Sequence, residues 1–318
     1  MGVLTKNACR RNINRNICSR LVIQNIPRGN DLSLVPLLIL LYLELEMSEN
    51  VTPQPSVVSL NPDQGSGNDF MTALKNAGLP TVTGIEATIS PRVVNGELTP
   101  RHTEISKQLY DYFKKIAEEF KPRFNDDVLF LTISCNTLSL QVFVHEAFER
   151  LGEDIEDFDT KVQAVLNIDS IVKHCEKSKD QVIKTVVLGT KPLQKILADT
   201  YPDKVQTFAN FKGATDNDLE LVQEIIWRVK AIQGSDTSTA PKKYEGQLDD
   251  EKTLRKKVKE LEEIIQQLGI SEIVMGCTEL PTAFLQYGDS SRTFNLVNPA
   301  ELVAQEINAR FNSDKNDY

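Results

Sequence analysis

The chain has 318 residues, of which 40% are hydrophobic and 25% are charged, and its formal net charge is −9 at pH 7. This composition excludes a collagen-like, low-complexity or fully disordered chain, and the acidic balance argues against nucleic acid as the main partner. The length suits one large domain or two of ordinary size. Five cysteines without a Cys-x-x-Cys pair exclude a disulfide scaffold and lack the usual spacing of structural zinc or thioredoxin-type redox motifs.

Residues 1–46 differ in composition from the rest of the chain. They hold six basic and three acidic side chains, and they include an apolar run, Leu34–Leu43, that Pro36 interrupts. Ten residues are too few to cross a membrane as a helix, which takes about 20. A basic stretch before a short apolar run also occurs in targeting signals, but no small-residue cleavage site follows this one. We interpret 1–46 as an extension upstream of a domain starting at Met47. We expect a cytoplasmic protein, or an organellar one if the extension is a targeting signal.

The body of the chain alternates short apolar or β-branched runs with amphipathic helical patterns. The predicted strands are Ser56–Leu60, Thr81–Ser90, Asp127–Ser134, Val162–Ile168, Ile183–Leu188 and Glu272–Met275. The predicted helices are Thr103–Phe120, Leu138–Leu151, Asp218–Gln233 and Asn298–Phe311. Such alternation predicts an α/β protein with parallel sheets.

A polar, breaker-rich stretch, 235–250, is predicted to be a loop or insertion. After it, apolar residues step by 4, 3, 4 and 3 positions among charged ones. They are Leu254, Val258, Leu261, Ile265 and Leu268. We interpret them as the buried side of an amphipathic helix on a sheet, with a coiled-coil contact as the alternative.

Two cysteines occur in matching local sequences. Cys135 follows the apolar run Phe130–Ser134, and Cys277 follows Ile273–Gly276. Each motif is a buried strand, a small residue, a cysteine, a polar residue and then the start of a helix. In parallel sheets this places both thiols at the carboxyl ends of strands, where open α/β sheets bind ligands. A nearby helix N-terminus is expected to lower the pKa of each thiol and favour the thiolate.

Other interpretations of the cysteines stay open. A single buried cysteine after a strand is usually a small apolar residue, and Cys175 lacks the context of the two motifs. A cysteine–histidine hydrolase is the less favoured alternative, because nothing in the spacing links His102, His145 or His174 to a motif cysteine.

At these residues a family becomes recognisable. Three motifs, Ser134–Thr137, Val187–Thr190 and Met275–Pro281, resemble in order the landmarks of the aspartate/glutamate racemase superfamily. Asn298–Leu302 resembles its closing segment, so the resemblance covers about residues 55–312. Glutamate racemases usually have a histidine where this chain has Glu279, which indicates the aspartate racemase-like branch.

The resemblance implies two similar Rossmann-like lobes with the active site in the cleft between them. The first lobe would be 47–165, completed by a C-terminal helix at 296–312. The second would be 166–295, including the polar insertion 235–250. The family usually opens with a glycine-rich loop that holds substrate, and the equivalent stretch here, Asn61–Asn68, matches it poorly.

The resemblance also implies a cofactor-independent, two-base racemisation of an acidic amino acid, aspartate or glutamate. Cys135 and Cys277 would be the acid/base pair, one on each face of the α-carbon. The remaining residues would hold or orient the substrate, and they are Ser66, Arg92, Asn136, Thr137, Thr190, Thr278 and Glu279. Arg92, after the second predicted strand, is a candidate to bind a side-chain carboxylate because arginine can bond both carboxylate oxygens, and a surface arginine in a loop is the alternative.

No cofactor is expected. No lysine has a Schiff-base context for pyridoxal phosphate, no Cys/His cluster has metal spacing, and Gly65-x-Gly67 lacks the third glycine of an NAD fingerprint. The expected partner is a small amino-acid substrate, without nucleic acid or membrane, and a homodimer is left open. Two alternatives remain: a catalytically silent carboxylate-binding protein, and a dicarboxylate isomerase.

Overall fold

The computed structural model describes residues 55–61, 64–79, 82–86, 93–94, 97–98, 102–120, 128–135, 141–181, 183–235, 237, 240–244, 246 and 248–314. The chain divides into two units, Met1–Pro53 and Gln54–Tyr318, and every described residue belongs to the second. The prediction for 1–46 therefore lies outside the described residues. In the described part, no helix combines the length and apolarity that crossing a bilayer requires.

The first sheet is parallel, with the order β2-β1-β5-β6. Its strands are β1 (Ser56–Asn61), β2 (Val82–Glu86), β5 (Leu129–Ile133) and β6 (Val162–Ala164). All of β5 is buried, as its continuous apolar sequence predicts. A separate antiparallel pair joins β3 (Val93–Val94) to β4 (Glu97–Leu98).

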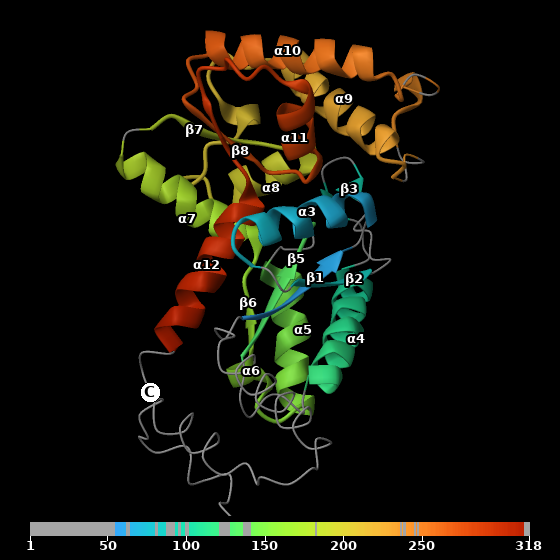
Figure 1. Cartoon of the computed structure of the whole chain (residues 1–318), viewed down its shortest axis with the longest axis vertical. Helices are drawn as coiled ribbons and strands as arrows, with labels where there is room; N and C mark the ends of the chain where they lie inside the picture. Colours follow the sequence, from blue (N-terminus) through green and yellow to red (C-terminus); the bar gives the residue numbers. More distant parts are fainter. Residues whose placement is uncertain are drawn as a thin grey trace, which may run out of the picture. The chain divides into compact units, whose positions relative to one another are not determined.

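Helices cover both faces of this sheet (Figure 1). The helices α4 (His102–Phe120) and α5 (Gln141–Asp154) pack against each other and on the β1 and β5 side chains that include Leu60 and Leu131. The short α6 (Phe158–Lys161) extends that layer. On the other face, α3 (Gln64–Asn76) packs with the C-terminal α12 (Pro299–Asp314) around Val57 and Phe130.

The second sheet is also parallel, with the order β7-β8-β9. Its strands are β7 (Thr185–Leu188), β8 (Glu272–Met275) and β9 (Asn295–Val297). Beside β7, on the side away from β8, Thr207 forms an isolated parallel bridge with Val187. The helices α9 (Asp216–Ile232) and α10 (Glu251–Gln267) cover one face, and α7 (Asn167–Asp180) and α8 (Lys191–Thr200) cover the other. Short helices complete this half, and they are η2 (Phe208–Asn210), η3 (Lys242–Tyr244), α11 (Glu279–Thr282) and the π-helix η4 (Ala283–Tyr287).

The two sheets repeat one topology. In each, the second segment in chain order lies beside the first, the third on the other side of the first, and the fourth beyond the third. The helix that follows the last strand of each sheet packs against the other sheet. After β6, α7 packs with Val187 and Val274 of the second sheet, and after β9, α12 packs with Val57 and Phe130 of the first. The chain therefore crosses from one sheet to the other twice. The predicted α/β fold with parallel sheets is confirmed.

The helical pattern after the polar insertion is an amphipathic helix on a sheet, as interpreted. Leu254, Val258, Leu261 and Ile265 of α10 are fully buried in one cluster with side chains of β7 and β8. In the described part of 235–250, η3 is the regular element.

Two predictions about elements are wrong in extent. The strand expected at Val162–Ile168 stops at Ala164, because the edge strand β6 pairs only with Leu129–Leu131 of β5, and α7 then begins at Asn167. The stretch expected as a substrate-holding loop, Asn61–Asn68, becomes helical from Gln64. Glycine permits this, because a Cβ at Gly67 would lie 2.6 Å from Cβ of the buried Asn61.

Candidate active site

The end of β8 is held against the end of β7 at Gly276. Its N–H donates to the carbonyl of Leu188 at 2.7 Å. A Cβ on Gly276 would lie 2.9 Å from Cγ1 of Val187 and 3.0 Å from the Leu188 carbonyl oxygen, so a larger residue would push the strands apart. This close approach positions the next residue, Cys277, at the carboxyl edge of the sheet, beside the point where its strand order reverses.

Cys277 forms a hydrogen bond with a buried carboxylate. Its Sγ donates to Oε2 of Glu279 at 2.6 Å, and the hydroxyl of Thr278 donates to the same oxygen at 3.3 Å. Glu279 is 2% exposed, and its Oε1 lies 3.3 Å from Nζ of Lys230, on the last turn of α9. Lysine, carboxylate and thiol therefore form one chain of contacts.

This environment reverses the expected effect on the Cys277 thiol. Burial raises its pKa well above the ordinary value, the Glu279 carboxylate raises it further, and Lys230 opposes them. The expectation of a lowered pKa is wrong here, because burial and the neighbouring Glu279 carboxylate both disfavour the thiolate. Cys277 consequently carries its proton at neutral pH.

We call the elements packed around the first sheet the first half and those packed around the second sheet the second half. A small cavity lies between Cys277 and residues of the first half. Its volume is about 20 Å³, room for about one water molecule and too little for an amino acid. The lining residues come from both halves of the chain, and they are Asp69, Phe70, Ala73, Asn167, Met275, Cys277, Thr278, Pro281, Asn298 and Pro299. A substrate would therefore need more room than this cavity provides.

Asp69 of α3 connects the two halves at the cavity. Its Oδ2 accepts hydrogen bonds from Nε2 of Gln233 at 2.6 Å and from Oγ1 of Thr282 at 2.7 Å. The sequence did not predict Asp69, Lys230 or Gln233 as site residues. Of the three, only Asp69 has a local indication of a role, because it directly follows the stretch expected to hold substrate.

Cys135 follows β5 in the first sheet, as predicted, and is half-buried against the core under α4 and α5. It is not among the described residues that line the cavity at Cys277. Its predicted neighbours Asn136 and Thr137, like Arg92, lie outside the described residues. Ser66 lies in the first turn of α3 rather than in a loop. Its side chain is outside the description.

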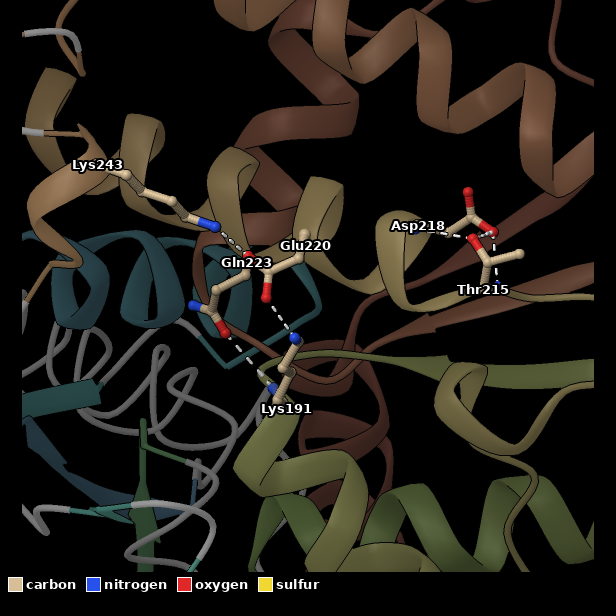
Figure 2. A network of polar contacts seen from close by, with 6 residues as sticks. All are labelled: Lys191, Thr215, Asp218, Glu220, Gln223 and Lys243. Atoms are coloured by element: carbon tan, nitrogen blue, oxygen red, sulfur yellow. Dashed lines mark hydrogen bonds and ion pairs between the residues drawn. The ribbon is translucent and has the colours of Figure 1, made fainter.

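Thr190 caps a helix at the carboxyl end of β7. Its Oγ1 accepts from the N–H of Leu193 at 3.4 Å, at the start of α8. Figure 2 shows how α9 holds this turn: the Lys191 N–H donates to Oε1 of Gln223, and Glu220 pairs with both Lys191 and Lys243. These hydrogen bonds and ion pairs lower the pKa of Glu220 to about 2. Thr190 therefore shapes the edge of the sheet rather than lining the cavity.

The same helix begins with a capping box, also drawn in Figure 2. The Thr215 hydroxyl accepts from the N–H of Asp218 at 3.3 Å, and the Thr215 N–H donates to the Asp218 carboxylate at 2.7 Å. The box fixes where α9 starts. The helix then carries Glu220 and Gln223 to α8, and Lys230 to Glu279.

Among the described side chains, Cys175, His145 and His174 are not in contact with this centre. Burial raises the pKa of Cys175 to about 12, which disfavours its thiolate at neutral pH. His174 contacts Glu272 at 2.9 Å, at the amino end of β8 and opposite Cys277. His145 is exposed on α5. Among the described residues, no three His, Cys, Asp or Glu side chains are grouped so that they could hold a metal.

The fold and this site define an α/β protein with two parallel sheets of matching topology and, at the edge of one of them, a half-buried thiol that donates a hydrogen bond to a buried carboxylate. No family model and no curated protein sequence matches the chain.

Several solved structures resemble it. An aspartate racemase homologue from Pyrococcus horikoshii is 14% identical, covering 81% of this chain and 99% of that one, with a TM-score of 0.47. Glutamate racemase from Francisella tularensis, in complex with D-glutamate, is 14% identical over 82% of each chain, with a TM-score of 0.45. Glutamate racemase from Thermus thermophilus is 18% identical over 83% of this chain and 82% of that one, with a TM-score of 0.40.

Proposed function

We propose that this protein is a racemase of an acidic amino acid, aspartate or glutamate, that uses Cys135 and Cys277 as its acid and base without pyridoxal phosphate or metal. One observation carries the proposal: Cys135 follows β5, which lies beside β1, Cys277 follows β8, which lies beside β7, and these strands hold equivalent places in the two sheets. Inversion at a carbon needs a base on one face and an acid on the other, and two equivalent positions on two sheets suit that requirement.

The contacts of Cys277 support the role of acid in the resting enzyme. In one direction, Cys135 as thiolate takes the α-proton, and the Cys277 thiol gives its proton to the opposite face of the carbanion. Cys277 is then a thiolate and Cys135 a thiol. In the reverse direction, the Cys277 thiolate takes the α-proton and Cys135 returns one. After the forward turnover, Cys277 regains a proton from water as Cys135 loses one, which restores the resting pair.

Glu279 and Lys230 would set the charge state of Cys277. Glu279 accepts the thiol hydrogen bond and favours the protonated form, whereas Lys230 offsets part of the negative charge. Asp69 faces the same cavity from the other half. When its bonds to Gln233 and Thr282 open, its carboxylate is free to accept the substrate ammonium.

One feature favours a second candidate, a silent carboxylate-binding protein. Cys135 is not among the described residues that line the cavity at Cys277. A binder would take up the ligand without breaking the α-carbon–hydrogen bond.

The deciding experiment follows the α-proton of L- and D-aspartate and of L- and D-glutamate by NMR in heavy water, with optical rotation recorded in parallel. A racemase exchanges the proton of both enantiomers and loses rotation. If the ligands bind, as measured by calorimetry, while neither exchange nor inversion occurs, the racemase proposal fails and the silent binder replaces it.

A further inference from the structure

A basic groove lies on the outer side of α10, away from the residues discussed so far. It is formed between α10 and the segment after η4, and its volume is about 540 Å³, within the ~300–1,000 Å³ range of small-molecule sites. The lining residues are Lys252, Arg255, Lys256, Lys259, Tyr287, Gly288, Asp289 and Ser290. The four cations follow the helical spacing i, i+3, i+4 and i+7, so they form one stripe about 10 Å long.

These four cations make no close ion pair within the described residues, although Lys259 lies near enough to Asp289 to lower the pKa of that carboxyl. All four are exposed, and none forms an ion pair there, although Arg255 lies over the ring of Tyr287. Lys257, on the adjacent side of the same helix, contrasts with them because it pairs with Glu224 at 3.5 Å and with Glu260 at 3.7 Å. In a chain with a net charge of −9, this groove is a local concentration of unneutralised positive charge.

The opposite wall of the groove is fixed by a buried carboxylate. Glu262 is 3% exposed, and both of its oxygens accept from the N–H of Asp289, at 3.1 and 2.9 Å. Arg292 donates to the same carboxylate at 3.1 Å and to the carbonyl of Phe284 in η4 at 2.8 Å. The segment facing the lysines is therefore tied to α10 itself, which makes the groove preformed.

Carboxylates near the groove offset part of the positive charge that a ligand would have to neutralise. Asp289 is the carboxylate among the described lining residues, and a bond from the N–H of Ser291 and nearby Lys259 lower its pKa, so it stays ionised. Burial and the nearby carboxylate of Glu251 raise the pKa of the Tyr287 phenol. Four cations against Asp289 and Glu251 leave an excess of two positive charges along the stripe. A ligand with one carboxylate would leave half of it unpaired.

We infer that this groove binds a small ligand bearing a chain of two or three phosphates. A diphosphate or triphosphate supplies several negative oxygens along a length similar to the lysine stripe, and charge-assisted hydrogen bonds to lysine and arginine are strong. The ligand is either inorganic polyphosphate or a nucleoside polyphosphate. The inference does not depend on the racemase proposal, since it concerns the opposite side of the second sheet from α7 and α8 and involves no residue of the cavity.

The test is calorimetric titration of the full chain with inorganic tripolyphosphate, ATP and AMP. We expect tripolyphosphate and ATP to bind, and AMP to bind at least about tenfold more weakly, because each lost charge-assisted contact costs about that factor. Tighter binding of ATP than of tripolyphosphate would identify the nucleotide as the ligand, whereas equal affinities would identify the phosphate chain alone. Absence of binding by both triphosphates would overturn the inference.

The variant pair is K256A/K259A and the matched control K257A on the same helix. The double variant should lose at least about tenfold in affinity for tripolyphosphate, and the control should stay within about twofold of the parent protein. Thermal melting verifies that both variants remain folded. If K257A lost as much affinity for tripolyphosphate as the double variant, the attraction would depend on overall charge, and the proposal of a specific binding site would be contradicted. Binding to phosphatidylserine vesicles by a protein that ignores both triphosphates would identify a membrane surface instead.

Discussion

The two motif cysteines occupy equivalent places in the topology but differ in their chemical surroundings. Cys277 has a buried carboxylate at 2.6 Å, a lysine behind that carboxylate, and a cavity in front of it. Cys135 is half-buried against the apolar core under α4 and α5. The strand order repeats, but the residues that tune Cys277 come from α9 and α11 of its own half. A repeated fold can therefore place two thiols at equivalent positions while helices of one half set the surroundings of one of them.

The largest expected effect tests whether the two cysteines are a pair. Cys135→Ser and Cys277→Ser should each reduce racemisation by about 10²–10⁴-fold, because a hydroxyl is too weak an acid to replace the missing thiol. Each variant should still exchange the α-proton of one enantiomer, the one whose hydrogen faces the remaining cysteine. NMR exchange with separate enantiomers measures this, and Cys175→Ser is the control expected to behave like the parent protein.

The next largest effect concerns the contacts that set the pKa of the Cys277 thiol. Glu279→Gln removes a carboxylate that raises the pKa of the Cys277 thiol, so its alkylation should begin at lower pH. Lys230→Gln removes a charge that lowers the same pKa, so alkylation should begin at higher pH. Mass spectrometry of iodoacetamide-treated protein follows Cys277 alone across the pH series. Shifts of the same sign in both variants would show that the Lys230–Glu279–Cys277 contacts do not control the thiol.

The sequence predicted the strands that carry the cysteines because buried parallel strands have continuous apolar sequences. Phe130–Ile133 and Ile273–Met275 are such runs, and the structure places them as expected. The sequence predicted Glu279, the hydrogen-bond partner of Cys277, as a site residue. It could not predict Lys230, which pairs with Glu279, or the bridging role of Asp69, because both residues are far from Cys277 in the chain. The thiol pKa was misjudged for a related reason. Local sequence indicates a helix start, whereas burial depends on the packing of α3 and α9 around it.

A smaller effect is expected for the hydrogen bonds of Asp69 to Gln233 and Thr282, which bridge the two halves. Asp69→Ala removes the acceptor of the half-buried Gln233 and the buried Thr282, and leaving the Thr282 hydroxyl without this acceptor costs about 1–3 kcal/mol of unfolding free energy. It should also speed alkylation of Cys277, because the cavity opens more often. Urea unfolding measures the first quantity and thiol alkylation the second.

Thr282→Val is the matched variant for this bridge, since it keeps the bond from Gln233 to Asp69 and removes only the hydroxyl. It should cost less stability than Asp69→Ala. A double variant whose loss equals the sum of the two single losses would contradict the shared bridge, because residues bonded to each other are expected to couple.

The smallest expected effect concerns Glu220, which ties α8 and η3 to α9 (Figure 2). Its folded pKa of about 2 lies below the ordinary 4.5, so its contribution to stability is fully present above pH 4.5. That contribution is lost as pH falls from 4.5 through about 2, because the unfolded chain takes up the proton first. The side chain is 41% exposed, so solvent screening keeps the contribution below about 1 kcal/mol. Glu220→Gln should lower the urea midpoint at pH 7, and the difference from the parent protein should shrink toward pH 3. A difference that stays constant across this range would mean that Glu220 acts through packing rather than through its charge.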